Sequence, residues 1–119
     1  MIAAVEERRR ERGRLIARAT EYAGALAKRL DLCAVVVAGS VARGDFNVWS
    51  DIDVVVIAED LPERVPDREL ALIAGAPARV QPVGFTPAEF EAALAKGNPL
   101  AREAVDAGVA VAGELPGAG

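Results

Sequence analysis

Two aspartates, Asp51 and Asp53, occupy alternate positions where an apolar segment begins. In a strand, residues two apart project from the same face, so both carboxylates point the same way while Ile52 is buried behind them. Two neighbouring carboxylates repel each other unless a cation lies between them. Mg²⁺ takes one or two protein carboxylates and completes its octahedron with water and substrate phosphate. The pair therefore predicts a magnesium site, with a two-metal arrangement for in-line displacement also possible.

A second candidate element, Gly39-Ser40, ends the apolar run 34–38. Glycine lets a ligand approach the backbone closely. If Ser40 opens a helical turn, the free backbone N–H groups of that turn bind an anion, and the Ser40 hydroxyl adds a donor. Arg43, one turn later, is placed to reach the same phosphates. These residues predict a site for a phosphate chain.

The amino-acid composition excludes several kinds of functional site. The 119 residues contain no histidine and one cysteine, Cys33, so His triads, His metal sites and internal disulfides are excluded. The 14 basic and 18 acidic residues give a net charge of −4, which argues against a dedicated nucleic-acid surface. Hydrophobic residues make up 52% and aromatic residues only 4%, so we expect an aliphatic core in one small domain.

Two strands must position these residues. Segments 32–38 and 51–58 are apolar at almost every position, which is typical of strands buried on both faces. The connection between them is too short for the usual parallel crossover with its helix, so we predict antiparallel neighbours. This pairing brings Gly39-Ser40 beside Asp51 at one end of the sheet.

The other elements surround this pair. A long helix over 1–30 carries an apolar stripe at helical spacing. Its members are Leu15, Ala19, Tyr22, Leu26 and Leu30. A short helix over 67–74, with Asp67 as its cap, precedes a third strand over 78–84, where Pro82 indicates a sheet edge. Thr86, Pro87 and Glu89 predict the start of a helix that runs to about 96.

The remaining segments are a helix over 99–107, a fourth strand over 109–112 and a flexible tail over 114–119. The fold class is α/β in the α+β sense, with a small mixed or antiparallel sheet of three to four strands and helices packed on it. We expect one domain over 1–113, made of the N-terminal helix 1–30 and a core over 32–112. No secretory signal and no segment of bilayer length is present, so we expect a cytoplasmic protein.

The segments 39–44 and 50–53, which read GSxARG and SDxD, resemble the signature of the DNA polymerase beta-like nucleotidyltransferase superfamily. The chain length and the TPxEF segment at 86–90 resemble the minimal nucleotidyltransferases of prokaryotes. The resemblance implies the polymerase beta-like nucleotidyltransferase fold. It also implies that the motif residues bind nucleotide and that the aspartates bind metal and carry catalysis. The implied nucleotide-binding residues are Gly39, Ser40, Arg43 and Ser50, and the implied metal-binding and catalytic residues are Asp51 and Asp53.

The implied reaction is magnesium-dependent transfer of a nucleoside monophosphate, AMP from ATP, to a hydroxyl of a protein or small acceptor. Some minimal members act as antitoxins that adenylylate a tyrosine of a helical HEPN-type partner. We expect this small chain to need such a partner, or a second copy of itself, to complete its substrate cleft. Homo- or hetero-oligomers therefore both remain open.

One residue departs from the family pattern. The family commonly carries a third carboxylate on a following strand, where this chain has Gln81. Glutamine forms hydrogen bonds but is not a base near neutral pH. Either another acid replaces it, with Glu89 and Glu91 as candidates, or transfer is weak, or the chain has lost catalysis and only binds. In the loop before Ser50, Phe46 and Trp49 either stack on a base or pack over the loop.

Overall fold

Strands β1 (Leu32–Ala38) and β2 (Ile52–Ala58) run antiparallel at the centre of the sheet in the computed structural model, which describes residues 2–116. Strand β3 (Val80–Phe85) pairs with β2 in parallel, and β4 (Val109–Gly113) pairs with β1 antiparallel. Within the described residues the sheet has four strands in the order β3-β2-β1-β4. The predicted mixed sheet is confirmed, and so is the edge position of the proline-containing strand, since a proline cannot donate to a neighbour.

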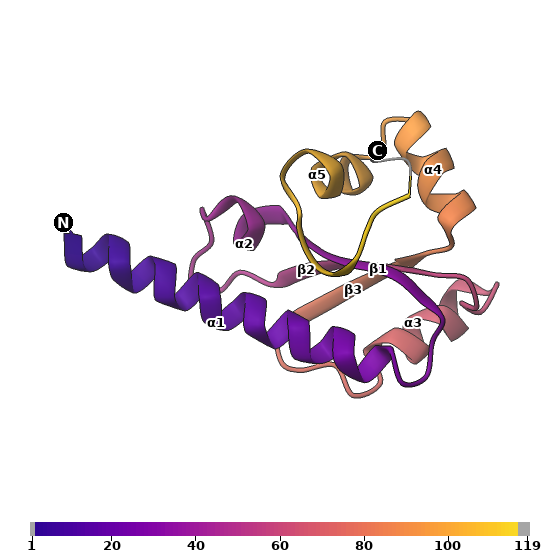
Figure 1. Ribbon diagram of the computed structural model, residues 1–119, viewed down its shortest axis with the longest axis horizontal. Helices are drawn as coiled ribbons and strands as arrows, with labels where there is room; N and C mark the ends of the chain where they lie inside the picture. Colours follow the sequence, from indigo (N-terminus) through magenta and orange to yellow (C-terminus); the bar gives the residue numbers. More distant parts are fainter. Residues whose placement is uncertain (1, 117–119) are drawn as a thin grey trace.

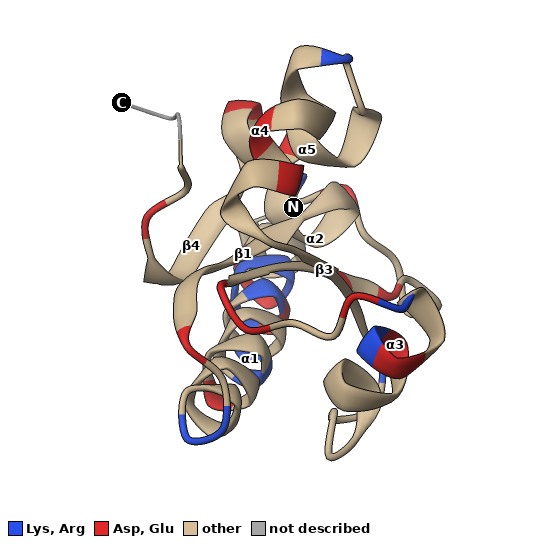
Figure 2. Ribbon diagram, turned by 90° about the vertical axis from the view of Figure 1, so that its right-hand side faces the viewer, with Lys and Arg blue, Asp and Glu red and all other residues tan. Residues whose placement is uncertain are grey.

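Helices cover both faces of this sheet (Figure 1). Helices α1 (Ile2–Leu26) and α3 (Val65–Ile73) lie on one face, and α4 (Pro87–Ala95) and α5 (Pro99–Ala107) lie on the other. Helix α2 (Gly39–Arg43) is a single short turn between β1 and β2. Acidic and basic residues are interspersed along α1 and α3 (Figure 2).

The core has two hydrophobic clusters, one on each face of the sheet. Strand residues alternate between them, so that Val35 and Val37 face α1 while Ala34 and Val36 face α4 and α5. This alternation is the ordinary period of a strand, and it explains why the two central strands are apolar at every position.

The N-terminal helix is shorter than predicted. It ends at Leu26, and residues 27–30 form a turn in which Arg29 N–H donates to the Leu26 carbonyl at 3.0 Å. The turn is fixed because the Arg29 side chain donates to the carbonyls of Ala71 and Ala74, at the end of α3. The predicted stripe is otherwise confirmed as core, with Leu30 only half-buried.

Helix α3 starts earlier than predicted, at Val65, and the predicted cap at Asp67 is wrong. Arg64 precedes the helix, and Asp67 lies inside the first turn. Pro66 explains the difference, because proline fits the first turn of a helix, where its missing N–H is not needed. The predicted start at Thr86 is confirmed as a full capping box with Glu89.

The predicted flexible tail over 114–119 lies partly outside the described residues, as does residue 1 of the predicted N-terminal helix. Leu115, in the described part of the tail, packs against the cluster on the α4 and α5 face. Within residues 2–116, no helix is both long and apolar enough to cross a membrane.

Candidate active site

Asp53 lies near the N-terminal end of β2 and is half-buried. Its register partners are Ala38, the last residue of β1, and Gln81 of β3. Asp51 precedes β2 and is exposed, and its charge acts on Asp53. The sequence therefore placed both aspartates at one end of the sheet correctly, although only Asp53 belongs to the strand.

Gly39 lies so close to the Asp53 carboxylate that a side chain added at Gly39 would force this carboxylate to move. A Cβ added to Gly39 would lie 2.3 Å from Asp53 Oδ2. Gly39 also has φ = +68°, a conformation that L-residues with a side chain rarely adopt. Both facts require glycine here, and they place the start of α2 directly against the candidate metal ligand.

Helix α2 begins with its backbone donors uncapped. The preceding residue, Ala38, is extended and gives no side-chain hydrogen bond to the helix. Gly44 closes the helix in the left-handed conformation, with its N–H donating to the Ser40 carbonyl at 2.8 Å. The helical turn predicted after Gly39 is therefore present and no side chain caps its start, while phosphate binding by its N–H groups stays a prediction.

Arg43, the last residue of α2, is held by two carboxylates. Its Nε donates to Asp45 Oδ2 at 3.2 Å, and its Nη1 donates to Glu103 Oε1 on α5. The hydrogen bond to Asp45 raises the pKa of Arg43 further, so the guanidinium keeps its charge. Sequence reasoning missed Glu103, because it lies 60 residues after Arg43 and no local pattern joins the two.

Negative charge accumulates around Asp53. Burial raises the pKa of the Asp53 carboxyl, the charges of Asp51 and Glu103 raise it further, and Arg43 lowers it. A carboxylate that is unstable in its ionised form is stabilised by a bound cation. A cation bound here would therefore favour the ionised form of Asp53.

The donor set fits Mg²⁺ rather than a metal held by protein alone. Among residues 2–116, no group of three or more Asp, Glu or Cys side chains is arranged to hold a metal ion. The pair Asp51 and Asp53 supplies the one or two carboxylates that Mg²⁺ uses when water and phosphate complete its shell. Magnesium bound together with a nucleotide is therefore compatible with the residues present.

Gln81 lies next to Asp53 in the register between β2 and β3, and it is exposed. This is the position on the neighbouring strand where the sequence expected a third acid. Glu89, one of the two candidate replacements, is occupied elsewhere, since it accepts from Thr86 N–H and from Arg68, both at 2.8 Å. The Thr86 N–H and Arg68 lower the pKa of Glu89, which weakens it as a base.

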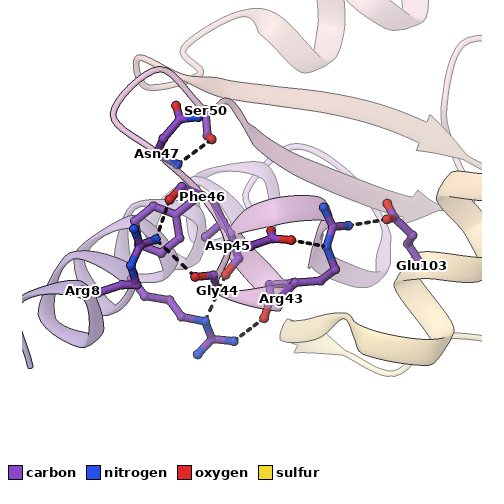
Figure 3. Close-up of polar contacts among 11 residues, drawn as sticks. Arg8, Arg43, Gly44, Asp45, Phe46, Asn47, Ser50 and Glu103 are labelled. Carbon is purple, nitrogen blue, oxygen red and sulfur yellow. Dashed lines mark hydrogen bonds and ion pairs between the residues drawn. The ribbon is translucent and has the colours of Figure 1, made fainter. Parts of the chain in front are cut away.

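Basic residues of α1 hold the backbone around α2 (Figure 3). Arg8 donates to the Phe46 carbonyl at 2.5 Å and lies over the Phe46 ring, 5.1 Å from its centroid. Arg12 donates to the carbonyls of Val41 at 3.0 Å and Ala42 at 2.7 Å. The charged start of α1 therefore supports the candidate site, a role that its sequence alone does not indicate.

The loop between α2 and β2 is also built by side chains. Ser50 Oγ accepts from Asn47 N–H at 2.9 Å, and Arg79 donates to the Ser50 carbonyl at 2.6 Å. Of the two aromatic residues, Phe46 is buried, whereas Trp49 is 88% exposed. Phe46 therefore packs under the loop, and only Trp49 is free to stack on a base.

A cavity of about 410 Å³ lies between α1 and this loop, lined by residues that include Arg8, Phe46 and Arg79. Neither Gly39-Ser40 nor the two aspartates line it. Asp53 instead lies on the face of the sheet that α5 covers, because it shares the parity of Val55, which packs in the cluster on that face.

Comparisons with known proteins agree with this fold. The nucleotidyltransferase domain family matches residues 20–90, which include β1, α2, β2 and β3. A crystal structure of a protein from Sulfolobus solfataricus, to which nucleotidyltransferase function is ascribed, has a similar fold. The TM-score is 0.65 at 23% identity, over 87% of this chain and 84% of that one. A comparison with curated proteins gave no significant match.

Proposed function

This chain belongs to the nucleotidyltransferase domain family of the DNA polymerase beta-like superfamily, and from that premise we propose that it is a magnesium-dependent nucleotidyltransferase. The proposed reaction transfers AMP from ATP to a hydroxyl of a protein or small acceptor. The observation that supports the proposal is the close approach of Gly39 to Asp53, which places the uncapped start of α2 against one of the two aspartates. We propose the cytoplasm, where ATP is available, as its location.

Each site residue has a proposed role. The N–H groups at Gly39 and Ser40 bind phosphate oxygens of the nucleotide, and Arg43 adds a charged donor. Asp51 and Asp53 hold Mg²⁺, which when bound neutralises phosphate charge in the transition state. Ser50 keeps the loop before Asp51 closed through its contact with Asn47 and stands at the edge of the nucleotide site.

In the proposed step, the acceptor oxygen attacks the α-phosphorus. A new O–P bond forms, the bond from the α-phosphorus to the bridging oxygen breaks, and pyrophosphate leaves with the electron pair. The acceptor hydroxyl must also lose its proton. Gln81 cannot take that proton near neutral pH, so we expect slow transfer in which water accepts it.

The test is binding of ATP measured by calorimetry with and without Mg²⁺. We expect Mg²⁺-dependent binding that disappears in Asp51→Ala/Asp53→Ala. The matched control is Glu21→Ala/Asp106→Ala, which removes two exposed carboxylates from α1 and α5 and leaves binding intact. Equal affinity in wild type and the Asp51/Asp53 double variant would refute the metal assignment.

The position of Gln81 beside Asp53 favours one alternative. In that alternative the chain keeps its fold and its nucleotide site but has lost transfer, and it acts by masking a partner such as a HEPN-type helical toxin. A second copy of the chain in place of such a partner is also compatible with the open site.

The two functions are separated by incubating the chain with labelled ATP, Mg²⁺ and the protein encoded by the neighbouring gene. Label on that protein supports transfer, whereas a tight complex without label supports masking. Gln81→Glu is expected to increase transfer about a hundredfold, the lower end of the range for general-base effects. Gln81→Leu serves as the control, since it changes the same position without adding a base.

A further inference from the structure

Two carboxylates from different parts of the chain bind the guanidinium of Arg43 (Figure 3). Asp45, in the loop after α2, accepts from Nε at 3.2 Å. Glu103, in the middle of α5, accepts from Nη1. Arg43 is therefore restrained by one local contact and by one contact that depends on the tertiary fold.

Glu103 lies in a part of α5 that packs tightly against the sheet. Its neighbours Ala101 and Ala104 are 0% and 3% exposed, and both pack in the cluster against the sheet. Small residues at these positions bring α5 close to β1 and α2. The backbone that carries Glu103 is thus held by packing, whereas the Arg43 side chain is long and can adopt many rotamers.

Arg43 still has donors to offer. Its guanidinium carries five N–H donors in a fixed planar fork, and the carboxylates above contact only Nε and Nη1. Within residues 2–116, Nη2 of Arg43 has no protein acceptor. Arg43 and Glu103 both act electrostatically on Asp53, so this ion pair lies at the same end of the sheet as Asp53.

We propose that Glu103 is a positioning residue for nucleotide binding: it fixes Arg43 so that the free donors of the guanidinium meet the phosphate chain. This inference rests on the proposed function, because it assigns an additional residue to the same site. Glu103 does not touch the nucleotide itself, and it acts only through Arg43.

Two effects of Glu103 on binding oppose each other. The charge of Glu103 repels a triphosphate. Its hydrogen bond orders the Arg43 side chain before the nucleotide binds, so Arg43 loses less conformational entropy on binding. The repulsion is reduced because Glu103 is paired with a cation and its side chain is 42% exposed, where water and salt screen it. The positioning effect therefore outweighs the repulsion, and removing the Glu103 charge weakens binding.

The experiment measures the affinity for ATP with Mg²⁺, and for inorganic tripolyphosphate, by calorimetry in a double-mutant cycle. The variants are Glu103→Gln, Arg43→Gln and the two combined. We expect Glu103→Gln to weaken binding about three- to fivefold, the upper range for a partly exposed ion pair. In the Arg43→Gln background the same change is expected to alter affinity by less than about 1.5-fold, because the residue through which Glu103 acts is gone.

Asp106→Asn is the matched control, since it removes one negative charge from the exposed side of the same helix. We expect it to leave the affinity unchanged or slightly increased. Thermal unfolding of each variant shows whether the substitution lowers stability. The double-mutant cycle separates positioning from a purely structural role, because a structural role would weaken binding equally with and without Arg43.

Unchanged or tighter binding in Glu103→Gln, or an equal effect in both backgrounds, would overturn the positioning role while leaving the proposed function intact. Absence of ATP binding in the wild type would overturn the proposed function. In that case the tripolyphosphate measurements alone test the role of Glu103. The positioning role is supported if Glu103→Gln weakens tripolyphosphate binding only when Arg43 is present, and it is refuted if the wild type does not bind tripolyphosphate.

Discussion

Gly39 lies where the backbone of α2 meets the carboxylate of Asp53. The positive φ angle and the 2.3 Å approach of a hypothetical Cβ are separate constraints at this residue. Gly44, at the other end of α2, has φ = +90° but no atom within 4 Å of its hypothetical Cβ. The two glycines therefore allow conformational strain to be distinguished from collision with the site.

We expect Gly39→Ala to lower the free energy of unfolding by about 2 kcal/mol or more and to abolish nucleotide binding, because the methyl group displaces Asp53. Gly44→Ala should cost only about 1 kcal/mol, from strain alone, and should retain binding. Chemical denaturation and ATP calorimetry measure both quantities. Similar losses of binding in the two variants would contradict the importance of the Gly39 contact.

The ionised side chain of Asp53 destabilises the folded state. Its pKa is raised by burial and by Asp51 and Glu103, so ionisation is less favourable in the folded chain than in the unfolded one. The folded state thus loses stability as the pH rises through the unfolded pKa of about 4 to the raised folded pKa, and the loss persists above it. Below the unfolded pKa the aspartate is neutral in both states and contributes nothing.

Asp53→Asn is accordingly expected to raise the free energy of unfolding at pH 7, in the absence of Mg²⁺, by about 0.5–1 kcal/mol while removing metal-dependent ATP binding. The gain should vanish near pH 3. Denaturation curves across this pH range check the sign. A variant less stable than wild type at pH 7 would show that Asp53 has a favourable partner that outweighs burial and repulsion.

At the scale of elements, α4 is fixed by a capping box and an ion pair at its start. Thr86 Oγ1 accepts from Glu89 N–H at 3.2 Å, and Glu89 Oε1 accepts from Thr86 N–H at 2.8 Å. Arg68 of α3 also donates to Glu89 and to the Pro62 carbonyl. The cap therefore stabilises α4 and joins it to the opposite side of the sheet.

Glu89→Gln should lower stability at pH 7 by about 0.5–1 kcal/mol, a value that allows for screening of a carboxylate that is 48% exposed. The pKa of Glu89 is lowered in the fold, so its stabilisation is present above the unfolded pKa of about 4.3 and is lost as the pH falls through the folded pKa. The difference from wild type should thus disappear in acid. Glu91→Gln, an exposed change two residues later, is the control and should have little effect at any pH.

At the scale of the whole molecule, the two hydrophobic clusters share the same two central strands. Leu26 is fully buried on the α1 face and Phe90 on the α4 face. Because β1 and β2 contribute alternate residues to both clusters, neither cluster can form without the strands that the other also needs. One cooperative unfolding transition follows from this arrangement.

Leu26→Ala and Phe90→Ala are each expected to cost about 3–5 kcal/mol and to lower a single calorimetric transition. Leu70→Ala, on the exposed side of α3, should stay within about 0.5 kcal/mol of wild type. Two resolved transitions in either core variant would show that the two faces unfold independently.

The sequence by itself determined the strand pair, the turn and the placement of the aspartates. Continuous β-branched runs, a short connection and Gly39 are local features, and their physical consequences do not depend on distant residues. The helix start at Thr86 was likewise predictable, since its capping residues are adjacent in the chain. The early start of α3 was missed because Pro66 can end a connection or begin a helix, and only packing selects between them.

Only the tertiary structure decided which distant groups complete the candidate site. The parallel pairing of β2 with β3 places Gln81 beside Asp53, and the packing of α5 brings Glu103 to Arg43. Arg8 and Arg12 reach the α2 segment because α1 crosses beneath it. Such contacts join residues tens of positions apart, and their formation depends on how whole elements bury their apolar faces, which no local pattern records.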